Sequence, residues 1–189
     1  MDKWSNLPNS SGHVPPVNSR LCRRLGAVAA VSGIAFLTIN MVMWLVPEMA
    51  PSVARGMANL QDEPITLTPK IRATGLVIST LYLSILARGL FVARRLLRRL
   101  ADGRIFEPET GVLLRRFGMS LVVYAGVTPF VATGMAWLIT MLNGPGKRLV
   151  GFGLTDHEVV LAIIGIIILT TGSVMAEATR IAEENRQIV

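Results

Sequence analysis

Four apolar runs, almost free of charge, constrain the fold of this chain more than any other feature. They cover residues 25–46, 73–93, 117–142 and 159–176, and Arg88 is the one charged residue within them. A helix needs about 20 apolar residues to cross the hydrocarbon core of a bilayer. Backbone groups in lipid must hydrogen-bond within the protein, which favours helices over open strands. The sequence therefore predicts four membrane-spanning helices.

The composition excludes most other protein classes. Hydrophobic residues make up 51% of the 189 residues and charged residues only 16%, against about 25% in a typical soluble domain. Intrinsic disorder requires low hydrophobicity, and one cysteine cannot form a disulfide framework. We predict an all-α integral membrane four-helix bundle, with a single four-span domain at residues 25–189 behind a disordered basic arm at residues 1–24.

Local signals mark the expected helix limits. Thr68 followed by Pro69 reads as an N-cap before a proline in the first helical position. Thr155 and Glu158 have the spacing of a capping box that opens the fourth span. Pro129 lies inside the third run, where we expect it to kink the helix rather than end it, because neighbouring helices can satisfy the freed carbonyl.

The arginine and lysine distribution predicts the orientation. Counted over alternate segments, the chain carries 14 such residues on one side and 5 on the other, and the richer side is normally cytoplasmic. Both termini and the central loop are then cytoplasmic. In the outer loops, residues 65–68 and 149–154 could pair as short strands, although irregular loops are the simpler alternative.

The central segment, residues 94–116, predicts a cytoplasmic amphipathic helical hairpin. Its arginines fall on one helical face, Asp102 and Gly103 should end the first helix, and Glu107 with Pro108 should begin the second. The candidate docking residues for a partner or lipid are Arg94, Arg95, Arg98, Arg99, Arg104, Ile105, Phe106, Arg115, Arg116, Glu177, Glu183 and Glu184.

Glu177, Glu183 and Glu184 belong to a short cytoplasmic helical extension after the fourth span. We expect the basic hairpin and this acidic tail to pair, and a cytoplasmic protein partner or anionic lipid to compete for the pairing. The alternative is that the arginines only fix topology and reach toward the membrane surface. Direct nucleic-acid binding is disfavoured, because aromatic side chains do not interleave with the arginines.

Two segments carry a family resemblance. Residues 103–109 (GRIFEPE) with 114–118 (LRRFG), and the tail at 177–189, resemble the bacterial four-span membrane proteins grouped as domain of unknown function 2975. The family often has Thr where Glu107 stands and Asp-type residues near Asn185. The resemblance implies a multi-pass protein of the bacterial inner membrane. It implies no known activity and therefore supplies no catalytic residues.

The sequence offers little for catalysis. The two histidines, His13 and His157, do not lie at ligand spacing from Cys22 or from clustered carboxylates, whereas a zinc site needs three or four convergent ligands. We predict no catalytic residue, cofactor or metal, and hence no enzyme.

The alternative function is a subunit of an oligomeric transport or channel complex. Asn40 is the most polar residue inside a span and would line such a pathway. Glycines such as Gly118, Gly126 and Gly134 recur along the third span. They are expected to pack within the monomer, with a homo-oligomer face as the alternative.

Overall fold

The computed structural model describes residues 19–60, 65, 67–104, 107–141 and 155–187, and this part of the chain is helical without a strand. The helices are α1 (Ser19–Leu45), α2 (Ala50–Ala58), α3 (Pro69–Ala101), α4 (Pro108–Thr140) and α5 (Asp156–Gln187). Helices α1, α3, α4 and α5 are long and apolar enough to cross a membrane. The predicted all-α fold with four candidate spans is confirmed.

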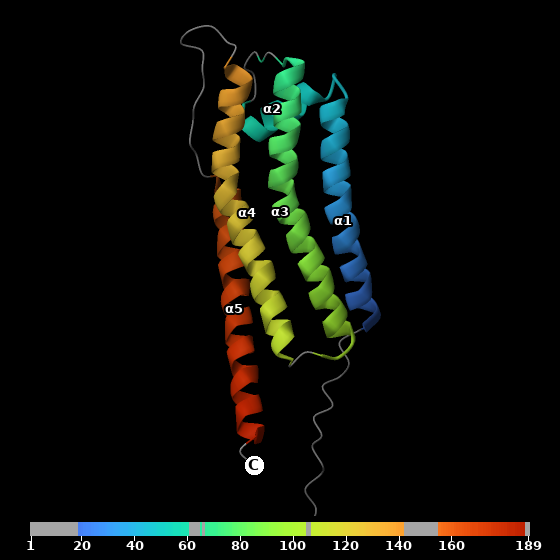
Figure 1. Cartoon of the computed structure of the whole chain (residues 1–189), viewed down its shortest axis with the longest axis vertical. Helices are drawn as coiled ribbons and strands as arrows, with labels where there is room; N and C mark the ends of the chain where they lie inside the picture. Colours follow the sequence, from blue (N-terminus) through green and yellow to red (C-terminus); the bar gives the residue numbers. More distant parts are fainter. Residues whose placement is uncertain (1–18, 61–64, 66, 105–106, 142–154, 188–189) are drawn as a thin grey trace, which may run out of the picture.

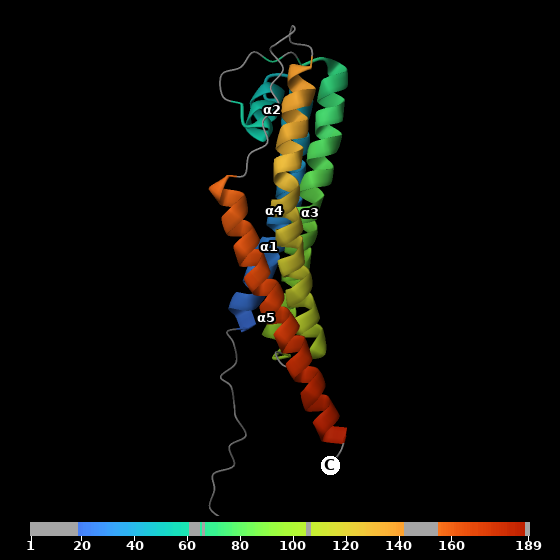
Figure 2. The ribbon, with the colours of Figure 1, turned by 90° about the vertical axis from the view of Figure 1, so that its left-hand side faces the viewer.

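The four long helices form an open row rather than a closed ring. Helix α1 packs against α3, α3 against α4, and α4 against α5, while α2 lies on α4. Figure 1 shows the row with α1 and α5 at its opposite edges, and Figure 2 shows α5 crossing α4 obliquely. The row follows chain order, as expected when consecutive antiparallel helices are neighbours.

The N-cap at Thr68 is confirmed, and Glu158 forms its half of the predicted capping box. The hydroxyl of Thr68 accepts a hydrogen bond from the Ile71 amide at 3.4 Å. The Thr155 amide donates to Glu158 Oε2 at 2.7 Å, and the Thr155 hydroxyl donates to the same oxygen. Pro129 lies inside α4, which continues past it to Thr140.

Two segments differ from the sequence prediction. Helix α1 begins at Ser19, so residues 19–24 are helical and do not belong to a disordered arm. Residues 50–58, expected in an irregular loop or near a strand, form α2. Residues 65, 67 and 68 have no strand structure, and the other residues of the proposed strand pair, 66 and 149–154, lie outside the described part of the chain.

Helix α2 exists because one of its faces can be buried. Ala50, Ala54 and Ala58 recur every fourth residue and are at most 6% exposed, packed in a cluster that includes Trp44 and Met135. Small side chains at this spacing let a short helix lie close against α4. We call the end of the row that carries α2 the α2 end, and the opposite end, where α3 ends and α4 begins, the arginine end.

Helices α4 and α5 are staggered along their axes. Gly111 contacts Ala176, and Gly118 contacts Gly165 and Leu169, so Val131 lies opposite the start of α5 at Asp156. Helix α4 continues to Thr140, about 14 Å further at 1.5 Å per residue. Figure 2 shows the same offset: α5 begins well short of the α2 end and extends beyond the arginine end.

Candidate functional site

The predicted hairpin at the arginine end is formed by a tight connection. The amide of Asp102 donates to the carbonyls of Arg98 and Arg99 at 3.0 and 3.1 Å, which ends α3. Gly103 then adopts a φ of +77°, in the left-handed region where glycine carries no steric penalty. The chain reverses here, and α4 returns against the last turns of α3.

This reversal creates a groove of about 590 Å³ between α3 and α4. Its lining combines cationic and apolar side chains: Arg95, Arg98, Arg99, Pro108, Glu109, Val112, Leu113 and Arg116. Four arginines face one carboxylate in this lining. We call it the arginine groove, and its excess positive charge favours an anionic occupant.

Two nearby carboxylates, Glu107 and Glu109, already neutralise one arginine of the groove, Arg99. Arg99 Nη1 donates to Glu107 Oε2 at 3.2 Å, and Arg99 also pairs with Glu109. Arg104 Nε lies 3.8 Å from Glu107 Oε1. The Thr110 hydroxyl donates to the Arg104 carbonyl at 2.7 Å, which supports the first turn of α4. Arg99 is therefore held in place between two acids.

The other groove arginines remain available. Arg95, Arg98 and Arg116 are exposed, and the ion pairs formed by the described residues do not include them. Exposed arginines of this kind contribute little to stability, so the stability of the fold does not account for their concentration on one groove.

Arg94, Arg104 and Arg115, also predicted to dock a partner, are not part of the groove lining. Arg94 is half-buried, and its Nε has no hydrogen-bond partner in the described chain. Arg104 lies in the connection between α3 and α4, and the backbone of Arg115 packs against Gly172 of α5. Ile105 and Phe106 lie outside the described residues.

The acidic tail pairs within its own helix. Arg180 donates to Glu177 and, at 2.7 Å, to Glu184. The hydrogen bond from Arg180, followed by its positive charge, lowers the pKa of Glu177. These two acids thus have Arg180 as their partner instead of the basic hairpin, contrary to our expectation. Glu183 lies in α5 among the residues whose backbone alone is described.

The hairpin instead pairs with α1. Arg23 Nη2 donates to Asp102 Oδ1 at 3.2 Å, and both side chains are more than half exposed. The first turn of α1, expected in the basic arm, is therefore positioned beside the connection between α3 and α4. Because both groups are solvated, the pair orients the chain more than it stabilises it.

The polar residue predicted inside a span has a packing role. Asn40 is 6% exposed, and its Nδ2 donates to the Thr80 hydroxyl at 3.2 Å. This bond joins α1 to α3. Between α3 and α4, the hydroxyls of Tyr82 and Thr128 lie 2.8 Å apart. Interhelical hydrogen bonds of this kind are worth about 0.6 kcal/mol each.

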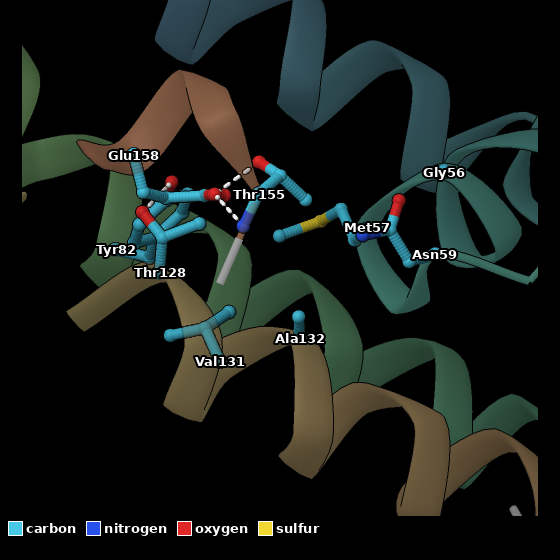
Figure 3. A pocket seen from close by; sticks show the side chains of 9 residues that line it. All are labelled: Gly56, Met57, Asn59, Tyr82, Thr128, Val131, Ala132, Thr155 and Glu158. Atoms are coloured by element: carbon cyan, nitrogen blue, oxygen red, sulfur yellow. Dashed lines mark hydrogen bonds between the residues drawn. The ribbon is translucent and has the colours of Figure 1, made fainter. Parts of the chain in front are cut away.

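A second pocket, at the α2 end, was missed from the sequence. It measures about 240 Å³ and is lined by Gly56, Met57, Asn59, Tyr82, Thr128, Val131, Ala132, Thr155 and Glu158. Figure 3 shows Glu158, Tyr82 and Thr128 on one side and Met57 and Asn59 on the other. We call it the α2-end pocket.

One sequence signal could have indicated this pocket. The apolar run at residues 159–176 has 18 residues, against 26 at residues 117–142. This difference suggests that the two neighbours do not start and end at the same level, although the helices themselves are nearly equal, with 33 residues in α4 and 32 in α5. The position of the gap could not be derived, because it depends on which glycines of α4 and α5 meet.

Metal ligation finds no support in the described residues, which contain no group of three or more His, Cys, Asp or Glu side chains able to hold an ion. Cys22 is 6% exposed and has its thiol free.

Comparison with known proteins gives a family match. The sequence profile described as "Protein of unknown function (DUF2975)" matches residues 56–189, which is more than half of the chain. No curated protein and no solved structure matches it.

Proposed function

The chain belongs to the DUF2975 family of proteins of unknown function, and from this premise we propose that it is a non-enzymatic membrane module that docks a partner at the arginine groove. It is a multi-pass protein of the bacterial inner membrane, with both termini and the arginine end in the cytoplasm. The count of 14 basic residues against 5 supports this orientation. Its role is regulatory or scaffolding.

The observation that carries the proposal is the arginine groove itself, together with its level relative to the expected membrane surface. Gly26 of α1 contacts α3 at Arg94 and Leu97, so Arg95 and Arg98 lie level with the start of the apolar run at Leu25. The groove therefore opens at the membrane surface, where an anionic group can reach it from the cytoplasm.

The occupant that we propose is an acidic segment of a protein partner. Glu107 and Glu109 pair with Arg99, which shows that carboxylates fit among these arginines. The stagger of α5 adds a second contact surface. Ala176 lies opposite Gly111, so the last turns of α5 extend about 12 Å beyond the start of α4. A protruding helix beside a basic groove suits a protein better than a lipid headgroup.

The test compares two variants with the same loss of charge. In the first, Arg95 and Arg98 are both replaced by Gln; in the second, Arg20 and Arg24 of α1, which are exposed and outside the groove, are both replaced by Gln. Each tagged protein is purified from its native membrane, and the proteins that accompany it are quantified.

We expect the groove variant to lose the partner and the α1 variant to retain it, because only the first removes charges that converge on one site. Retention of every accompanying protein by the groove variant would contradict the proposal. Loss of bound anionic lipid alone, with the protein partners unchanged, would also contradict it.

The alternative, a transport or channel subunit, would use Asn40 to line a pathway. The hydrogen bond from Asn40 to Thr80 supports a packing role for that amide. Flux of solutes through liposomes that contain the purified protein would support the alternative.

A further inference from the structure

We propose that the α2-end pocket is a binding site for a small organic cation, a primary ammonium group on a short alkyl chain. The pocket lies at the opposite end of the molecule from the arginine groove, so this inference does not depend on the proposed docking function. It is formed where α5 begins beside α4 and where α2 ends.

The stagger of the helices explains why a pocket exists there. Helix α5 covers α4 only as far as Val131, and α2 covers α4 near Met135 and Ile139. Between the part of α4 that α5 covers and the part that α2 covers, neither helix fills the space against Val131 and Ala132. The pocket is thus a consequence of the packing of whole helices and not of a single side-chain rotamer.

The pocket places polar groups unusually deep. Thr128 is level with Tyr82, and the bond between Asn40 and Thr80 puts Tyr82 within one turn of the level of Asn40 in α1. The apolar run of α1 extends to Val46, about 10 Å further at 1.5 Å per residue. Polar and ionisable groups at such depth cost free energy, and they commonly mark ligand or ion sites in membrane proteins.

The charge of the pocket selects a cation. Among the described residues that line it, Glu158 is the one carboxylate and none is basic. Both hydrogen bonds from Thr155 go to Glu158 Oε2, which orients the carboxylate and leaves Oε1 free of Thr155. An ammonium group at Oε1 would form a charge-assisted hydrogen bond.

The remaining lining selects a primary amine with a short apolar chain. The hydroxyl oxygens of Tyr82 and Thr128, on the same side of the pocket as Glu158 (Figure 3), can accept the other two N–H groups. Met57 and Val131 provide an apolar wall for the alkyl chain. The volume of about 240 Å³ is below the 300–1,000 Å³ of drug-sized sites, and a bare metal ion would leave most of it unfilled.

The test measures binding of n-butylammonium chloride to the full chain in detergent micelles by isothermal titration calorimetry, with n-butanol as the neutral analogue. We expect saturable binding of n-butylammonium that is at least tenfold tighter than that of n-butanol. Glu158→Gln should weaken it at least tenfold. Gln is also found at this position of capping boxes, so the first turn of α5 is kept while the charge is removed.

The matched control is Asp156→Asn. It removes the same charge from the same turn, and Asp156 is exposed and outside the pocket lining. Its affinity for n-butylammonium should stay within about twofold of wild type. A second variant, Ala132→Leu, fills the pocket without a change of charge and should abolish binding while the helical circular dichroism signal is unchanged.

Four outcomes would overturn the proposal: no binding of n-butylammonium by the wild type, equal affinity for n-butanol, equal losses in Glu158→Gln and Asp156→Asn, or undiminished binding by folded Ala132→Leu. Equal losses would mean that a diffuse charge at the start of α5 attracts the cation. Selective loss in Glu158→Gln and Ala132→Leu would support a defined site.

Discussion

The packing of α4 against α5 can be tested by the same substitution at two positions of one helix. A Cβ atom on Gly118 would lie 2.5 Å from the Leu169 amide nitrogen and 2.7 Å from the Gly165 carbonyl oxygen. These are backbone atoms, so α5 as a whole would have to shift. A Cβ on Gly126 would meet no atom within 4 Å. Gly118→Ala and Gly126→Ala are therefore a matched pair.

The expected difference follows from two effects. Replacing a helix-interior glycine by alanine favours the helix by about 1 kcal/mol, and this gain is common to both variants. Overpacking a well-packed contact costs about 1–3 kcal/mol, and only Gly118→Ala incurs it. The two variants should thus differ by about 1–3 kcal/mol in their free energy of unfolding, with Gly126→Ala equal to or above wild type.

The assay is reversible unfolding in mixed micelles, with sodium dodecyl sulfate as denaturant and helical circular dichroism as the signal. Equal stability of the two variants, or a more stable Gly118→Ala, would refute the close approach of α4 and α5. Gly126 was expected to pack within the monomer, but a Cβ atom there would meet no neighbour within 4 Å. A separate variant, Gly126→Leu, tests the alternative of an oligomer face. Loss of association with retained fold would assign the exposed glycine to an interface between two copies.

Two further predictions concern the α2 end and the orientation. Arg72 Nη2 donates to the carbonyls of Trp44 and Leu45 at 2.8 and 2.9 Å, so Arg72→Met should lower the free energy of unfolding by about 1–3 kcal/mol, while Lys70→Met, at an exposed position, should change it by less than about 0.5 kcal/mol. A topology reporter fused after Val189 should be active in the cytoplasm, and activity only on the far side of the membrane would contradict the proposed orientation.

The helix limits could be predicted because their signals are local. Thr155 and Glu158 are three residues apart, and their capping bonds form whatever the rest of the chain does. Gly103 ends α3 because its left-handed conformation follows directly from the lack of a side chain. The membrane spans were predictable for a similar reason, since length and hydropathy decide them without knowledge of neighbours.

Helix α2 could not be predicted with the same certainty. Its alanine spacing was visible in the sequence, but a helix of nine residues is not stable alone. It forms because Met135 and Ile139 of α4 offer a surface for Ala50 and Ala54. Those partners lie some eighty positions further along the chain, and only the packing of the helices brings them together.

The ion pairs also differ in how far they could be predicted, because some join neighbours on one helix and others depend on how the chain turns. Glu177, Arg180 and Glu184 have the three- and four-residue spacings of pairs on one helix face, and the structure shows that these local pairs form. Our prediction placed the acids against the basic hairpin and gave too little weight to this spacing. The two acids on Arg99, by contrast, required the geometry of the connection around Gly103.

The register of α5 against α4 connects both proposed sites. Movement of α5 by one turn toward the arginine end would carry Glu158 about 5 Å deeper, to the centre of the apolar run of α1, where a carboxylate is most costly. Movement by one turn toward the α2 end would bring Arg180 to Gly111, where Ala176 now packs closely. The charge of Glu158 opposes one shift and the small residues oppose the other. The observed register therefore fixes both the α2-end pocket and the length of α5 that extends beside the arginine groove.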